Sequence, residues 1–170
     1  ANPLTLTILT PYMNVEVVMI NNNLYKTDAA GRARITINKL GPYTVEAQTP
    51  VIIVPLLQGG SRGIFIKWGD DVALNPRTVE MSEDLTLTAI YKTQHYLSIK
   101  TDPLGVTTIS GEGWYDSGTS VSTGTASAIV AGATGTRYVF LEWVIDGSSQ
   151  TGNPLSIIMS TPHNAVARYK

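Results

Sequence analysis

The last part of the chain, residues 137–170, repeats a stretch near the middle, residues 62–92. The shared residues keep their order: Arg62/Arg137, Phe65/Phe140 and Trp68/Trp143 are offset by 75 positions, and Met81/Met159, Ser82/Ser160, Ala89/Ala167, Tyr91/Tyr169 and Lys92/Lys170 by 78. The loop after Trp143 is therefore three residues longer than its counterpart. A repeat of this regularity indicates two copies of one structural unit, and it restricts the chain to architectures that can hold such a pair.

The repeat divides the 170 residues into a first unit, residues 1–93, and a second unit, residues 94–170. Leu4, Leu6 and Ile8 alternate with polar residues, which is the period of a half-buried strand. Similar short runs follow about every 8–12 residues between Gly, Pro, Asn and Asp turns, a spacing typical of sandwiches. We therefore predict an all-β chain made of two tandem immunoglobulin-like β-sandwich domains.

The repeated apolar residues are predicted to form the two cores, because equivalent aromatic positions in a repeated strand are ordinarily packing anchors. These anchors are Phe65, Trp68, Met81 and Tyr91 in the first unit and Phe140, Trp143, Met159 and Tyr169 in the second. The apolar run Val51–Leu57 is predicted to be a strand buried on both faces. Through Val51 and Ile53 it would serve either as a core strand or as an acceptor for a strand from another chain.

Residues 13–47 carry a recognisable series of short motifs. The series is Val15-x-Val17, then Thr27-Asp28-x-x-Gly31, then Gly41-x-Tyr43-x-Val45-x-Ala47. It resembles the transthyretin-like, carboxypeptidase-regulatory type of β-sandwich. That resemblance implies a scaffold or adhesive module rather than an enzyme.

A second set of motifs marks the second unit: Gly113-Trp114-Tyr115, Phe140-x-x-Trp143 and Met159-x-x-Pro162. The second unit, and the latter half of the first, resemble the internalin-type divergent β-repeat modules of bacterial and archaeal surface proteins. The resemblance implies a non-catalytic module of a secreted surface protein, with an archaeal origin favoured.

The composition excludes several classes of function. Charged residues make up 15% of the chain, against about 25% in typical domains. The net charge is −1, so no basic footprint for nucleic acid is present. The longest apolar run is far shorter than the roughly 20 residues that cross a membrane as a helix. Cysteine is absent, so no disulfide framework exists, and a first residue other than Met fits removal of a signal peptide. We expect an extracellular location.

No motif predicts a catalytic site or a cofactor. His95 and His163 lack the spacing of zinc ligands, and we interpret them as solvated. Asp70-Asp71 could offer oxygen ligands to calcium, but the spaced pattern of a calcium loop is missing and we interpret it as a hairpin turn. Trp114 and Tyr115 are adjacent aromatic residues, one of which must face outward in a strand, so they are candidates for contact with a sugar.

Two functions fit these observations. The first is a secreted structural subunit that self-assembles into a filament or surface layer. In this hypothesis the uncharged strand Leu4–Thr10 is donated to a neighbouring copy, which would accept Leu4, Leu6 and Ile8 in pockets. Such head-to-tail contacts build open filaments. Alternatively, this strand completes its own unit. The second function is an accessory or carbohydrate-binding module of a larger secreted hydrolase.

Overall fold

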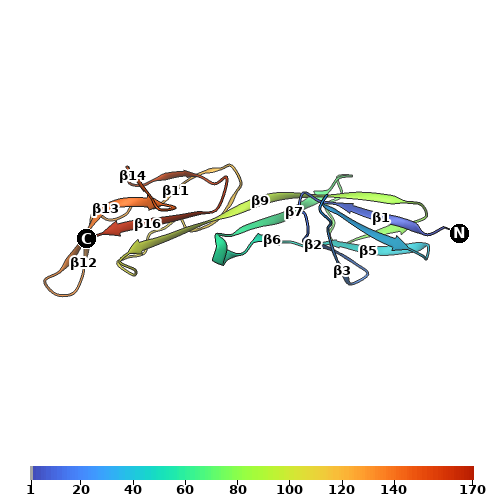
Figure 1. The fold of residues 1–170 in the computed structure, drawn as a ribbon, viewed down its shortest axis with the longest axis horizontal. Coiled ribbons are helices and arrows are strands. Elements are labelled where there is room, and N and C mark those ends of the chain that lie inside the picture. Colours follow the sequence, from blue (N-terminus) through green and yellow to red (C-terminus); the bar gives the residue numbers. More distant parts are fainter. Residues whose placement is uncertain (1) are drawn as a thin grey trace. The chain divides into compact units, whose positions relative to one another are not determined.

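The structure is a computed structural model that describes residues 2–170, and it is almost entirely β (Figure 1). Strand accounts for 56% of the chain and helix for 2%, which confirms the all-β prediction. The chain forms two compact units, one running to Ile53 and resuming at Arg62–Thr93, the other made of Val54–Ser61 and Gln94–Lys170. This division differs from the sequence-based boundary only in the segment 54–61, which belongs with the second unit.

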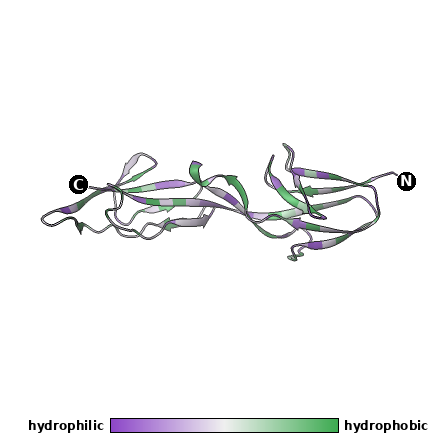
Figure 2. Ribbon diagram, turned by 90° about the horizontal axis from the view of Figure 1, so that it is seen from below, coloured by the Kyte–Doolittle hydropathy of each residue, from purple (hydrophilic) through white to green (hydrophobic). Residues whose placement is uncertain are grey.

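The first unit is built from two sheets. Its larger sheet has the strand order β6 (Val51–Val54), β7 (Ser61–Trp68), β9 (Leu85–Asp102), β1 (Leu4–Leu9) and β4 (Arg32–Ile37). Its smaller sheet has the order β3 (Asn23–Lys26), β2 (Glu16–Ile20), β5 (Gly41–Ala47) and β8 (Arg77–Met81). Hydrophobic and hydrophilic stretches follow one another along the ribbon (Figure 2). Buried residues alternate with more exposed ones along β4, so that strand presents one face to the core.

The second unit repeats this plan with a smaller second sheet. The larger sheet has the order β12 (Ile129–Ala131), β13 (Arg137–Ile145), β16 (His163–Tyr169), β9 and β10 (Gly113–Asp116), with β14 (Ser148–Gln150) also paired to β13. The other sheet pairs β11 (Ser120–Ser122) with β15 (Ser156–Ile158).

Strand β9 is shared by the two units, since it is the last strand of the first and the first strand of the second. In each unit the first and last strands pair in parallel: β1 with β9, starting at Leu6 opposite Leu85, and β9 with β16, starting at Leu97 opposite His163. The strand that precedes the repeated Phe-x-x-Trp strand is its neighbour in both units, β6 beside β7 and β12 beside β13. The repeat therefore holds for the topology of the N-terminal part too, where the sequences do not match.

The residues predicted as anchors lie in or against the two cores. Buried residues are Trp68, Met81, Trp143, Met159 and Tyr169, and partly buried residues packed on the cores are Phe65, Tyr91 and Phe140. In each unit the phenylalanine ring packs against the tryptophan and the tyrosine. The ring centroids are 5.1 and 5.7 Å apart in the first unit, and 6.3 and 5.7 Å apart in the second.

The prediction of one doubly buried strand over Val51–Leu57 is wrong beyond Val54. Strand β6 ends there, and Leu56–Gln58 form a short 3₁₀ turn, η1, whose Leu57 is fully exposed. Pro55 has no N–H to continue the ladder, which explains the end of the strand. Within β6, Val51 is buried in the core, Ile53 packs partly against it, and Ile52 points out with 54% of its surface exposed.

Candidate functional site

The N-terminal strand β1 lies inside its own sheet. It pairs with β4 on one side and with β9 on the other. Leu6 and Ile8 are fully buried, and Leu4 packs against the same core. The structure thus brings the three candidate assembly residues into their own unit, so a donated strand would have to leave this position first.

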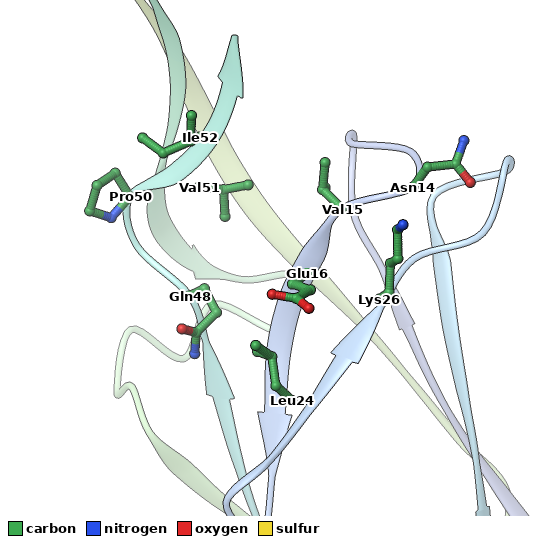
Figure 3. A pocket seen from close by; sticks show the side chains of 9 residues that line it. All are labelled: Asn14, Val15, Glu16, Leu24, Lys26, Gln48, Pro50, Val51 and Ile52. Carbon is green, nitrogen blue, oxygen red and sulfur yellow. The ribbon is translucent and has the colours of Figure 1, made fainter. Parts of the chain in front are cut away.

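A hollow of about 400 Å³ lies in the first unit between the β2–β3 hairpin and the segment that enters β6 (Figure 3). Its apolar lining includes Leu24 and Ile52, which are 46% and 54% exposed. Glu16 and Lys26, opposite each other in the β2–β3 register, supply one charge of each sign. The hollow follows β6, whose only strand partner among the described residues is β7, so it runs along an open sheet edge.

A larger hollow, of about 660 Å³, lies in the second unit. Its lining combines residues of η1 with residues of β9, β16 and the turns beside them. The members are Leu56, Leu57, Gln58, Gly59, Tyr96, Ser98, Lys100, Glu112, Asp146, Pro162, His163 and Asn164. Tyr96, Ser98 and Lys100 alternate with the core residue Leu97 along β9, so they belong to the outer face of the sheet.

Gly59 lines this hollow, and Gly60 follows it in the chain. Gly59 and Gly60 have φ of 120° and 99°, values that residues with a side chain rarely adopt. A Cβ on Gly59 would come within 2.9 Å of Pro162, and one on Gly60 within 2.9 Å of Tyr96. The backbone N–H of Tyr96 also donates to the Gly60 carbonyl (3.0 Å). These close approaches hold η1 against β9 and the turn before β16 within the second unit.

Two carboxylates of the hollow are held in place. Glu112 accepts hydrogen bonds from the backbone N–H of Ile99 and from the Tyr96 hydroxyl, both at 2.8 Å, and this carboxylate raises the pKa of Tyr96. Asp146 contacts Nδ1 of His163 at 2.5 Å and accepts from the backbone N–H of Asn164 at 2.8 Å. Sequence reasoning missed Glu112 as a site residue because its partners lie 13 and 16 positions away.

The aromatic pair Trp114–Tyr115 is divided between the two faces of β10. Trp114 lies opposite Tyr96 in the strand register, and their ring centroids are 5.2 Å apart in an edge-on arrangement. Tyr115 packs against the core, and its hydroxyl donates to the Gly111 carbonyl at 2.6 Å. The two rings therefore do not form one platform, and the aromatic side chain that lines the hollow is Tyr96.

Both histidines, interpreted from the sequence as solvated, are partly exposed and also have partners in the protein. His95 Nδ1 lies 2.7 Å from Ser61 Oγ and its Nε2 lies 3.2 Å from Ser117 Oγ, and burial lowers the pKa of the ring. His163 is held by Asp146, as described above. The topology brings these partners together from distant parts of the chain, which no local pattern could reveal.

The Asp70-Asp71 turn is held by two basic side chains. Arg77 donates to both carboxylate oxygens of Asp70 at 2.9 Å and lowers its pKa, and Lys67 pairs with Asp71 at 2.7 Å. Asp71 has φ of 67°, as a tight turn requires. Within residues 2–170, no group of three or more His, Cys, Asp or Glu side chains is placed to hold a metal ion.

Each unit contains an asparagine clamp, defined here as Asn75 in the first unit and Asn153 in the second. The Asn75 amide accepts from the backbone N–H of Ala47 (2.8 Å) and donates to its carbonyl (2.9 Å). Asn153 does the same with Ala126, at 2.8 Å for both bonds. The clamp could have been found from sequence, because both asparagines precede proline and are 78 positions apart.

No helix in the described part of the chain is long and apolar enough to cross a membrane. No protein family model, curated protein or solved structure matches the chain. Its function is therefore argued from its own geometry.

Proposed function

We propose that the chain is a non-catalytic, extracellular structural subunit made of two tandem immunoglobulin-like sandwich domains, and that copies of it self-assemble into a filament or surface layer. The matching strand orders of the two units support the tandem description. The low content of charge, which provides little repulsion between copies, supports assembly. The resemblance of the second unit to internalin-type surface modules points the same way.

The observation that carries the proposal is the position of β1. This strand carries no charge and fills a slot between β4 and β9 with Leu6 and Ile8 fully buried. An identical strand from a second copy fits the same slot in the same register. Exchange of an identical element between copies is a low-cost route to association, because the contacts of the folded unit are reused. When each copy gives its strand to the next, the contact is heterologous and the assembly stays open.

Single-cysteine variants test this exchange, because the chain has no cysteine of its own. Thr7 of β1 lies beside Thr86 of β9 in the parallel pair. The variants Thr7→Cys and Thr86→Cys, refolded together under mild oxidation, should give a disulfide-linked heterodimer within assembled material. The matched control uses Thr78→Cys in place of Thr86→Cys. Thr78 lies in β8 of the other sheet, and β8 pairs with β5. A Thr7→Cys/Thr86→Cys chain that links only within itself, with no heterodimer in the mixture, would show that β1 stays in its own unit.

Deletion of residues 1–10 gives a second test. Under strand donation the shortened chain stays folded and soluble when a peptide of residues 4–10 is added, and it binds that peptide but forms no filaments. Under the alternative, the first unit unfolds whether or not copies can assemble, and no peptide binding is measured by calorimetry.

The second candidate function is that of a non-catalytic accessory or carbohydrate-binding module of a larger secreted hydrolase. The observation that favours it is the polar hollow of the second unit. Negative-stain microscopy and size-exclusion chromatography separate the two functions, since filaments support the first and a sugar-binding monomer supports the second.

A further inference from the structure

We propose that the hollow of the second unit, bounded by η1, β9 and β16, is a binding site for a neutral carbohydrate. The volume of about 660 Å³ is within the range of ligand sites, roughly 300–1,000 Å³. The proposal rests on the second candidate function, to which it gives a site and a ligand class, and it does not depend on self-assembly, since it concerns the outer face of the second unit and needs only one copy of the chain.

Four polar side chains that line the hollow are free to bind a ligand. In the part of the chain that the structure describes, the side chains of Gln58, Ser98, Lys100 and Asn164 make no hydrogen bond or ion pair with another residue. They come from η1, β9 and β16 and line one hollow. Their polar atoms are therefore available to a ligand.

Two carboxylates of the hollow are hydrogen-bond acceptors whose positions the protein fixes. Glu112 and Asp146 are each oriented by two hydrogen-bond partners of the protein, one of them a backbone N–H. Each carboxylate has more acceptor positions than these partners use. Because these two carboxylates are already ordered before binding, a ligand does not have to offset the free-energy cost of ordering them.

The donors, acceptors and apolar surfaces of the hollow together indicate the class of ligand. Ammonium and amide donors stand beside carboxylate, amide and hydroxyl acceptors, and a sugar hydroxyl, which both donates and accepts, satisfies either kind. The walls add the apolar surfaces of Leu56, Leu57 and Pro162 and the ring of Tyr96, which suit the C–H face of a sugar ring. A carboxylated sugar would meet Glu112 and Asp146, and a cationic ligand would meet Lys100. Because Asp146 is already engaged by His163, Lys100 and Glu112 remain as one charge of each sign, and this balance favours a ligand without net charge.

The test is an NMR titration of the full ¹⁵N-labelled chain with maltose, cellobiose and lactose, alongside glucuronic acid and an Arg-Gly dipeptide. At least one neutral disaccharide should shift the backbone amides of Ser98, Lys100 and Asn164. The variant Lys100→Met, which keeps the length of the side chain and removes its donors, should weaken that binding about tenfold or more. The matched control Lys39→Met removes an exposed lysine from the first unit and should leave the affinity unchanged.

A second variant blocks the hollow by volume. Ser98→Phe fills its floor and should abolish the shifts, whereas Thr86→Phe, on the part of β9 that belongs to the first unit, should not. The melting temperature of each variant confirms that it folds. The proposal is overturned when no neutral disaccharide shifts the spectrum, when the shifts persist in Ser98→Phe, or when glucuronic acid or the dipeptide binds more tightly than every neutral sugar. Sedimentation of the same samples reports self-assembly independently.

Discussion

Replacement of Asn75 by alanine tests whether the asparagine clamp holds the first unit together. The Asn75 amide satisfies both backbone groups of Ala47, a residue that is only 2% exposed. Alanine removes the acceptor and the donor that the Asn75 amide supplies to Ala47. A water molecule in its place cannot make both hydrogen bonds with the same geometry. The backbone N–H and C=O of Ala47 are then left without protein partners in a mostly buried region that is open to water only at the edge of the clamp.

The expected loss follows from these two groups. A buried backbone group without a partner costs about 1–3 kcal/mol, and partial access of water to the edge of the clamp keeps each contribution near the lower end. The free energy of unfolding should therefore fall by about 2–4 kcal/mol. In a domain of this size, 1 kcal/mol corresponds to about 4–8 °C, so the melting temperature of the first unit should fall by roughly 8–32 °C.

The assay is thermal unfolding followed by NMR through the indole N–H signal of Trp68, because that ring lies in the core of the first unit and reports on it alone. The matched control is Asn38→Ala, an exposed asparagine whose side chain has no hydrogen-bond partner among the described residues, and it should change stability by less than about 0.5 kcal/mol. A melting temperature of Asn75→Ala within about 2 °C of the wild type would refute the reasoning, since it would mean that Ala47 finds other partners.

Three further predictions concern the core, the metal question and pH. Trp143→Ala should cost about 3–5 kcal/mol, because the ring is fully buried, and an unchanged melting temperature would contradict its role as an anchor. EDTA should leave the melting temperature unchanged, and a drop of several degrees would reveal a calcium ion at Asp70-Asp71. Burial raises the pKa of Tyr91, so as the pH rises above about 10 the unfolded chain ionises first and stability falls. Urea melts of Tyr91→Phe between neutral and alkaline pH should show a shallower fall, and an identical slope would exclude this residue as the cause.

Local patterns in the sequence were sufficient to predict that the chain is all-β. Alternation of period two marks a strand wherever one face is buried, because successive side chains point to opposite faces. The repeat also pointed to Trp68 and Trp143, since a ring that fills a core must recur wherever the core recurs. The Asp-containing turns were predictable for the same reason: the left-handed conformation of Asp71 is set within a few residues.

Which strand pairs with which was beyond the sequence, because pairing is decided by contacts between residues that are distant in the chain. The run Val51–Leu57 shows the difference: it is apolar throughout, but strand β6 ends at Val54, before Pro55, and Leu56 and Leu57 belong to η1.

The candidate sites depend even more on tertiary structure. The sequence by itself determined an uncharged first strand with alternating apolar residues, yet only the fold placed it between β4 and β9 and buried Leu6 and Ile8. The sequence likewise contains Glu112 and Lys100 without any motif that joins them. They line one hollow because β9 and η1 meet on the second unit, and hydrogen bonds over long sequence separations orient the carboxylates there. Periodicity is a property of neighbouring residues, whereas a binding site is a property of surfaces that come together only when the chain folds.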